Sequence, residues 1–409
     1  MERNCIISDD LVEEILSRLP VKDLLRFRCV SRGWCALIDD VSFIRKHYQV
    51  NYSFRKLDDN MTYFLNHTPP SDFSIDEFYL LNIQQGDALT VDLTADLKRD
   101  SRVVLPYEAD QYSILCYGCV NGIICLTCTS RKALIKDSFL ALWNPATREF
   151  KTIAYPNDPG LKFCHRSGIY GFGFDLSSSD FKILLIYVSC GEHEDSINQV
   201  IYSLKSDSWK QISNLPADIS GLPVGSTDGY LNGVYYWVTD LPQESGRPLH
   251  FVIVSFNFTA EVFKLSTLPH DAISLALESY SYQKIALYKE RLALAMSFKV
   301  QDEQSYNIHI WVATQLDDFG VPLSWEHLFN IGPHLAKLYI TVDTILLNGH
   351  LHVSFVFPVV TPYSDGCQDF EAYLYNHSTG KFKKFESRWH SWFRYVESLF
   401  PLSKRLIQT

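Results

Sequence analysis

Two short sequence patterns alternate through most of this chain, and their repetition restricts the folds that it can adopt. The first is an apolar strand, a turn rich in Thr, Ser, Asp or Gly, and a second strand that holds an aromatic residue; LWNPATREFKTI (142–153) is its clearest copy. The second is an Asn-Gly turn followed by an apolar strand, and Asn-Gly supplies the positive φ that a tight hairpin needs. Further copies of the first pattern begin at Ile201, Ser255, Ile308 and Leu374, and the Asn-Gly turns lie at 121–122, 232–233 and 348–349.

The spacing of these copies predicts a β-propeller. Successive copies lie about 50 to 65 residues apart, which fits a kelch-like blade better than the shorter WD-type blade. Each copy needs its neighbours to bury its faces, so the region should fold as one unit. The chain from Thr62 onward has room for about six blades, with the last strands completing the first blade. The predicted fold is α+β multidomain, with three N-terminal helices followed by an all-β kelch-like propeller of about six blades; a large β-sandwich is the alternative.

The N-terminal stretch 7–47 has helical spacing instead. Apolar residues at spacings of three and four predict a first helix that follows Ser8 as its N-cap and ends at Pro20, and two more short helices follow. Helices this short cannot enclose their own apolar surface, so the apolar stripe predicts an interface with a partner. The apolar positions of the three helices are Leu11, Val12, Ile15, Leu16 and Leu19; Val21, Leu24 and Leu25; and Val30, Trp34, Leu37 and Ile38.

This helical stretch resembles an F-box. The matching positions are Asp10-Leu11, Ile15-Leu16, Leu19-Pro20, Leu24, Val30 and Trp34, while Ile7-Ser8 stands where the family has Leu-Pro. The resemblance implies that the helices dock on a Skp-family adaptor of a cullin–RING ubiquitin ligase. An ordinary helical cap on the β domain is the alternative. The adaptor contact is expected to involve Leu11, Ile15, Leu16, Leu19, Pro20, Leu24 and Val30, together with Trp34, which should mainly brace the last helix.

The region that follows is similar to plant F-box-associated domains. Residues 118–126 resemble the opening signature of that family, with one extra residue before Asn121, and 142–148 and 170–175 resemble its next two signatures. Ser324-Trp325 is similar to a later one. The expected domains are therefore an F-box at 1–48, a linker at 49–60, and an F-box-associated β-propeller for substrate recognition at 61–409.

Composition argues against several classes of function. The net charge is −10, and no run of Lys and Arg interleaves with aromatic residues, so nucleic acid is not an expected partner. No apolar run reaches the length of a membrane span, and acidic residues interrupt any export signal at the N-terminus. Ten cysteines in such a chain are expected to be reduced thiols. The expected compartment is the cytoplasm, the nucleus or both.

No motif in the chain predicts catalysis, a metal or a cofactor. Cys116-x-x-Cys119 and Cys125-x-x-Cys128 have zinc-like spacing, but only five residues separate the pairs, which favours buried thiols on strands over a zinc site. Gly171-Phe172-Gly173 starts like a dinucleotide motif without its third glycine, so these glycines are expected to relieve crowding in a strand. His193 has acidic neighbours in a stretch typical of a solvated loop.

These features predict a non-catalytic substrate receptor, in which the F-box binds the adaptor and the propeller holds a target protein for ubiquitination and degradation. The loops 189–198, 241–249, 299–306 and 359–370 interrupt the repeat and are the candidates for target binding. The target is unknown; one branch of the resembling family recognises pistil ribonucleases on the pollen side of self-incompatibility, and others act in defence or hormone signalling. The alternatives are a propeller enzyme or carbohydrate-binding module with a dimerising helical head, and an F-box scaffold that acts outside a ligase.

Overall fold

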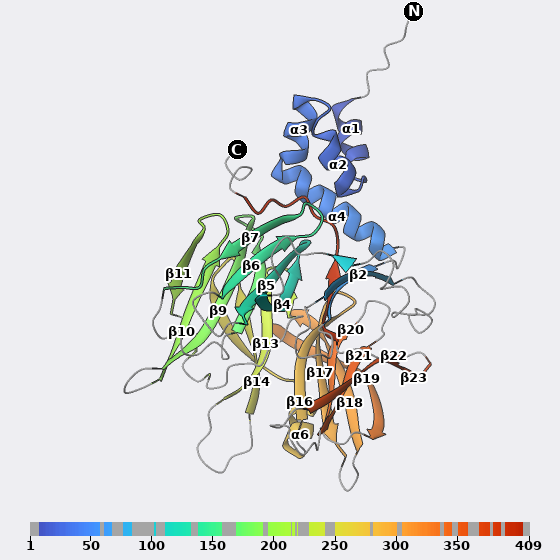
Figure 1. Ribbon diagram of the computed structural model, residues 1–409. Helices are drawn as coiled ribbons and strands as arrows, with labels where there is room; N and C mark the ends of the chain where they lie inside the picture. Colours follow the sequence, from blue (N-terminus) through green and yellow to red (C-terminus); the bar gives the residue numbers. More distant parts are fainter. Residues whose placement is uncertain are drawn as a thin grey trace, which may run out of the picture.

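The computed structural model shows a group of N-terminal helices standing on a ring of β-sheets (Figure 1). Helices α1 to α3 stand together, and α4 lies between them and the sheets. The structure describes residues 8–57, 61–67, 77–83, 102–103, 111–131, 138–157, 169–190, 195–213, 215–216, 219, 229–241, 250–278, 281–300, 305–335, 339–345, 351–358, 368–376, 379–385 and 389–403.

The three predicted helices are present. Ser8 caps α1 (Asp9–Leu16), and its hydroxyl accepts a hydrogen bond from the backbone N–H of Leu11. The expectation that α1 runs to Pro20 is wrong, because α1 ends at Leu16 and Pro20 is instead the N-cap residue of α2 (Val21–Phe27). Ser31 caps α3 (Arg32–Asp39) through a hydrogen bond from the backbone N–H of Trp34.

A fourth helix replaces most of the predicted linker. α4 (Val41–Leu57) is continuous, so the linker assigned to 49–60 is wrong over residues 49–57. The side of α4 that packs inward includes the polar residues His47 and Asn51 as well as apolar ones, and this mixture hides the helical period. Residues 58–60 lie outside the described residues.

The first three sheets each contain four antiparallel strands. In the first, β24 (Trp389–Tyr395), β1 (Met61–His67), β2 (Glu77–Ile83) and β3 (Arg102–Val103) pair in that order. The second contains β4 (Tyr112–Val120), β5 (Ile123–Ser130), β6 (Phe139–Asn144) and β7 (Glu149–Ile153). The third contains β8 (Ile169–Asp175), β9 (Asp180–Cys190), β10 (Asp195–Ser203) and β11 (Ser208–Ile212).

The other three sheets repeat this arrangement. The fourth contains β12 (Tyr230–Leu231), β13 (Val234–Leu241), β14 (His250–Asn257) and β15 (Val262–Thr267), and α6 (His270–Glu278) follows it. The fifth contains β16 (Ser281–Tyr288), β17 (Arg291–Lys299), β18 (Ser305–Leu316) and β19 (Pro322–Leu335). The sixth contains β20 (Tyr339–Ile345), β21 (Leu351–Pro358), β22 (Gln368–Asn376) and β23 (Lys381–Phe385).

The sheets close into a ring. Inner strands of neighbouring sheets contact one another from β4 to β8, β13, β16, β20 and β24, and β24 returns to β4. The last strand, β24, pairs with β1, so strands from the two ends of the propeller region complete one sheet, as the repeat predicted. A β-sandwich has two packed layers and no such ring, so the structure confirms helices followed by a β-propeller and excludes that alternative.

The described Asn-Gly turns have the predicted geometry. Asn121 and Gly122 have φ of 48° and 75°, and Asn232 and Gly233 have φ of 48° and 86°. Positive φ at both central residues is the geometry that joins two antiparallel strands most tightly. The third Asn-Gly, at 348–349, lies outside the described residues.

The two glycines of β8 relieve crowding, as predicted. A Cβ atom on Gly173 would lie 2.1 Å from Cε2 of the buried Phe258 ring, and one on Gly171 would lie 2.9 Å from Cδ1 of Tyr235. Tyr235 belongs to β13 of the neighbouring fourth sheet, and Phe258 lies in the turn between its strands β14 and β15. These glycines therefore allow the third and fourth sheets to pack closely.

Gly173→Ala is expected to lower the free energy of unfolding by about 1–3 kcal/mol, because the added methyl group overpacks a closed contact. Gly33→Ala is the matched control: Gly33 is exposed in α3, and the nearest atom to its added Cβ is 3.9 Å away. This control should change stability by less than about 1 kcal/mol, in the stabilising direction, since alanine favours helix. Denaturant unfolding measures both; an unchanged Gly173→Ala protein would contradict the packing argument.

Candidate adaptor-binding site and its junction with the propeller

Large apolar side chains are exposed on the helices that resemble an F-box. Leu11, Ile15 and Val30 are 51%, 48% and 61% exposed, and Pro20 is exposed as well. Leu11 and Ile15 are one helical turn apart on α1 and therefore share a face. All four belong to the predicted adaptor contact, and they leave apolar surface that nothing in the described chain covers.

The other predicted contact residues face inward to different degrees. Leu16 and Leu24 are only 1% and 0% exposed, so the structure places them in the core and not at a surface. Leu19 and Trp34 are half-buried. Trp34 packs edge-on against Phe27 of α2 with ring centroids 5.5 Å apart, and its role as a brace for the last helix stays a prediction. Periodicity alone could not separate these inward residues from the outward ones, because both lie among the same apolar positions.

The buried residues of the helices belong to one apolar cluster with the propeller. Leu16, Leu24 and Phe43 lie in the same cluster as Phe174 of β8 and Phe400 near the C-terminus. The expectation that these helices lack a core without a partner protein is therefore wrong, because the propeller of the same chain supplies that core. The exposed residues Leu11, Ile15 and Val30 remain outside this cluster.

Arg45 of α4 attaches the helices to the third sheet. Its guanidinium donates hydrogen bonds to the carbonyl oxygen of Leu176, at 3.2 Å, and to the hydroxyl of Ser179, both in the turn between β8 and β9. The guanidinium also lies over the ring of Phe174, 6.0 Å from its centroid. The next residue of α4, Lys46, forms an ion pair with Glu13 of α1, with Nζ 2.7 Å from Oε1. α4 thus holds α1 on one side and the propeller on the other.

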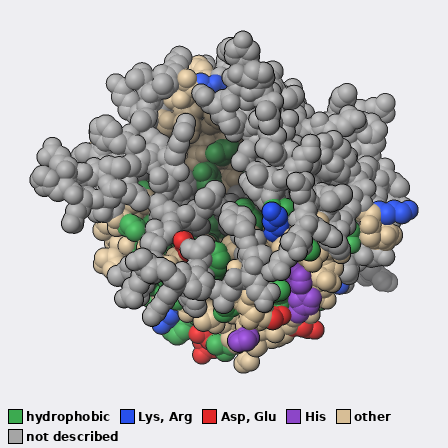
Figure 2. Space-filling view, turned by 90° about the horizontal axis from the view of Figure 1, so that it is seen from below, with side chains coloured by type: hydrophobic (Ala, Val, Ile, Leu, Met, Phe, Trp, Pro, Cys, Tyr) green, Lys and Arg blue, Asp and Glu red, His purple; other side chains and the backbone are tan. Residues whose placement is uncertain are grey.

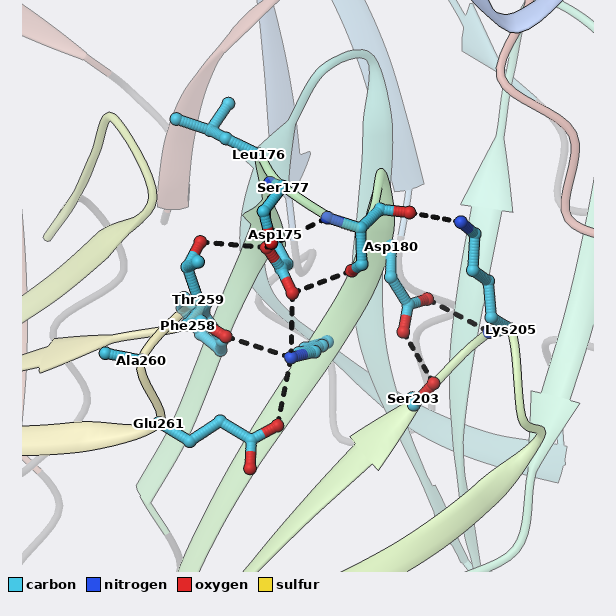
Figure 3. Close-up of polar contacts among 12 residues, drawn as sticks. Asp175, Leu176, Ser177, Asp180, Ser203, Lys205, Phe258, Thr259, Ala260 and Glu261 are labelled. Carbon is cyan, nitrogen blue, oxygen red and sulfur yellow. Dashed lines mark hydrogen bonds and ion pairs between the residues drawn. The ribbon is translucent and has the colours of Figure 1, made fainter.

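A polar cluster around Asp175 lies next to the turn 176–179, which accepts the hydrogen bonds from Arg45 (Figure 3). The buried Asp175 carboxylate accepts hydrogen bonds from Ser178 Oγ at 2.7 Å and Thr259 Oγ1 at 2.8 Å, and it lies 3.0 Å from Lys182 Nζ. Lys182 also donates to Glu261 at 2.9 Å. Burial alone would raise the pKa of Asp175, but the hydrogen bonds from Ser178, Lys182 and Thr259 outweigh it and lower the pKa. No sequence motif had indicated this cluster.

The C-terminal segment 396–402 lies between the helices and the second sheet. The backbone N–H of Val21 donates to Glu397 Oε2 at 3.3 Å, which joins this segment to the start of α2. The Asn144 side-chain amide donates to the carbonyl oxygens of Ser398 and Phe400 at 2.9 and 3.0 Å. The backbone N–H of Leu402 donates to Glu149 at 2.7 Å. Sequence reasoning missed this segment because it carries no repeat and its partners are far away along the chain.

α4 lies over the same end of the ring (Figure 1), and it carries Tyr48 and Tyr52. Burial raises the pKa of Tyr48, and Cys119, Tyr230 and Tyr395 lie close enough to interact with it electrostatically. These three residues belong to the second, fourth and first sheets. Burial also raises the pKa of Tyr52 to about 12, and its hydroxyl bonds with Glu290, which precedes β17, and Arg394 of β24. α4 therefore contacts the ring at several sheets and not at one edge.

The opposite end of the ring holds the described strand ends that flank the candidate target-binding loops. The turns 176–179 and 289–290 meet α4, and each joins the first and second strands of a sheet. The second and third strands must then be joined at the far end, which is called the distal face below. Figure 2 views that face, and hydrophobic side chains are visible in the hollow at its centre. The four candidate loops connect second and third strands, and their central residues 191–194, 242–249, 301–304 and 359–367 lie outside the described residues.

The cysteine pairs lie on β4 and β5, as predicted for thiols on strands. Cys116, Cys125 and Cys128 are buried, and Cys119 is partly buried. Burial raises the pKa of Cys119 to about 12 and raises that of Cys125 as well, so both remain protonated thiols near neutral pH. Within the described ranges, no three His, Cys, Asp or Glu side chains are grouped so as to hold a metal ion. His193 lies outside those ranges.

Buried His47 should make stability depend on pH. Its Nε2 lies 2.8 Å from the carbonyl oxygen of Leu19, while its Nδ1 is buried without a hydrogen-bond partner. Burial lowers the pKa of His47 below its ordinary value of 6.5. The unfolded chain then binds more protons than the folded chain as pH falls below 6.5, so the free energy of unfolding decreases in that direction and is unaffected above it.

We expect His47→Gln to show a smaller loss of stability than the wild type between about pH 7 and pH 5. Glutamine keeps a donor near Leu19 but does not titrate, so the difference between the two proteins isolates His47 from other histidines. Urea unfolding at several pH values measures it. Equal slopes for the two proteins would contradict a buried, neutral His47.

Comparison with known proteins agrees with this architecture. Residues 76–402 match the F-box associated beta propeller domain, and residues 5–46 match the F-box domain. The chain belongs to the F-box-associated β-propeller family. The F-box protein At3g08750 of Arabidopsis thaliana is 28% identical over 81% of this chain and 75% of its own length. The Arabidopsis F-box/kelch-repeat protein At3g17530 is 26% identical over 98% of this chain and 97% of its own length.

These matches confirm both resemblances that the sequence motifs indicated. The chain is an F-box protein with a C-terminal F-box-associated propeller, and the similar curated proteins include many from a plant. Among the described residues, no helix is long and apolar enough to cross a membrane.

Proposed function

We propose that this F-box protein is a non-catalytic substrate receptor of an SCF-type cullin–RING ubiquitin ligase. The observation that carries the proposal is the exposed apolar set Leu11, Ile15, Pro20 and Val30, on helices whose other side is fused to a propeller. Such a set is typical of a surface that a partner covers. The partner is a Skp-family adaptor, which in turn binds the cullin. Leu16 and Leu24 support this surface from inside, while Leu19 and Trp34 lie at its edge.

The rigid junction explains how a receptor without catalytic groups could promote ubiquitination. α4, the C-terminal segment and the shared apolar cluster fix the propeller relative to the F-box. A target bound to the propeller is then held at one distance and orientation from the ligase, which raises its effective concentration at the ubiquitin-loaded enzyme. We infer that each four-stranded sheet is one blade and that the target binds the distal face, since α4 occupies the other end.

The target is a protein whose identity the sequence leaves open. The net charge of −10 would attract a basic protein through long-range steering, which is compatible with the ribonuclease-recognising branch of the family. We expect the protein to act in the cytoplasm, the nucleus or both.

Co-expression with a Skp-family adaptor, followed by size-exclusion chromatography, tests the proposal. A stable one-to-one complex that also recruits the cullin–RING module is expected. A folded, monodisperse chain that does not bind the adaptor would contradict the receptor role. A complex that binds the adaptor but excludes the cullin would instead support a scaffold outside the ligase.

A further inference from the structure

Two histidines of the fifth sheet meet at the protein surface. His309 of β18 and His327 of β19 are separated by 18 positions in the chain, yet His309 Nδ1 lies 3.2 Å from His327 Nε2. Histidine side chains are also visible at the edge of the distal face in Figure 2. Neither the F-box nor the receptor role described above uses this pair.

A β-bulge brings the two side chains to the same face. The pairing of β18 with β19 shifts between Ile310, which is opposite Phe329, and Trp311, which is opposite His327, so Leu328 is left unpaired. Without this extra residue, His327 would lie opposite Val312 and point to the other face from His309. Bulges commonly re-aim a side chain next to a functional site.

Aromatic packing fixes the ring of His309. It stacks on Trp311 at an interplanar angle of 19° with centroids 5.6 Å apart, and it meets the Phe298 ring edge-on at 5.5 Å. The Trp311 indole N–H donates to the carboxylate of Asp271 in α6 at 2.9 Å, which places a negative charge next to the pair. His309 interacts electrostatically with that Asp271 carboxylate. A pre-oriented imidazole beside a carboxylate is favourable for a bound cation.

We propose that His309 and His327 form a two-histidine site for a divalent transition-metal ion such as Zn²⁺. Two nitrogens bound to tetrahedral Zn²⁺ at about 2.0–2.1 Å are about 3.3 Å apart, close to the separation that the pair already has. Both nitrogens must present lone pairs, so the proton now shared between them moves to the opposite nitrogen of its own ring. Water fills the remaining coordination positions, since two side chains supply two ligands.

The charged neighbours of the pair differ between the two faces of the sheet. Glu326, next to His327 along β19, is 3.8 Å from Arg291. Glu326 therefore points to the other face of the sheet from His327, and its ion pair with Arg291 lies on that face. Asp271 is the charged side chain that the described contacts place beside the pair.

Titration of the chelator-treated full-length chain with Zn²⁺ in a calorimeter tests this site. We expect a binding event in the wild type that weakens at least about tenfold in His327→Ala and is unchanged in His270→Ala, which removes an exposed histidine of α6. Binding should also weaken as pH falls below about 6, because protonated imidazoles cannot ligate.

A second measurement guards against a folding defect. Zn²⁺ should raise the thermal midpoint of the wild type and of His270→Ala but not that of His327→Ala, while all three proteins have equal midpoints without metal. Equal Zn²⁺ affinity and an equal thermal shift in His327→Ala would overturn the proposal. Loss of binding in both single variants would overturn it as well, since it would not be specific to the pair.

Discussion

Leu11→Asp combined with Ile15→Asp is expected to weaken binding to a Skp-family adaptor by about 100-fold or more. Each side chain is about half exposed in the free protein, so covering it should contribute about 1 kcal/mol. A carboxylate at each position would be buried in the complex without a partner, which costs at least a further 1 kcal/mol each. The sum of about 4 kcal/mol exceeds the roughly 2.8 kcal/mol that corresponds to 100-fold. Titration of the purified adaptor into each chain gives the affinities.

Leu323→Asp is the matched control for this double variant. Leu323 of β19 is 57% exposed, but it lies on the propeller and should not contact the adaptor. Both proteins should unfold at the wild-type temperature within a few degrees, because exposed substitutions change stability little. Wild-type affinity in the double variant, or an equal loss in Leu323→Asp, would refute the proposed surface.

Residues inside the helical domain would not test that surface. Leu24→Asp removes a fully buried side chain from the cluster shared with the propeller, so binding and folding would fail together. Leu19→Asp has a similar drawback, since Leu19 is half-buried and its carbonyl oxygen bonds with His47. The outward pair Leu11 and Ile15 separates the two effects.

Local signals in the sequence were enough to predict much of the fold. The apolar spacing in 7–47 and the Ser8 cap predicted α1 to α3, and Asn121-Gly122 and Asn232-Gly233 predicted tight hairpins. These features depend on neighbours within a few residues, so a single sequence reveals them. The repeat of such units then indicated a ring of sheets.

The parts that sequence reasoning missed depend on contacts between distant residues. Whether an apolar position of α1 faces out, as Ile15 does, or in, as Leu16 does, is decided by where the propeller packs. The junction through Arg45, Glu397 and Asn144 joins residues that are more than a hundred positions apart. No local pattern marks such residues, because their role arises only when the ring has closed.

Asp175→Ala is expected to lower the free energy of unfolding by about 3–5 kcal/mol, the usual cost of removing one partner from a buried ion pair. Lys182 is buried, and it would keep only Glu261 and the carbonyl oxygen of Phe258 as partners. The hydroxyls of Ser178 and Thr259 would lose their acceptor. Urea unfolding of the full chain measures the loss.

The same network provides the control and a second test by acid. Lys210 is exposed and also pairs with Glu261, at 2.7 Å, so Lys210→Ala should lower the free energy of unfolding by less than about 1 kcal/mol.

The pKa of Asp175 is lowered on folding, so the stability that its carboxylate contributes is complete above the ordinary value of 3.8 and is lost as pH falls through the lower folded value. Asp175→Asn should therefore lose less stability than the wild type in this acid range. If Lys210→Ala were as damaging as Asp175→Ala, or if acid destabilised Asp175→Asn as strongly as the wild type, stability would not depend on this buried carboxylate. The Arg45 contact would then rest on the packing of Phe174 and Phe400 around the same turn.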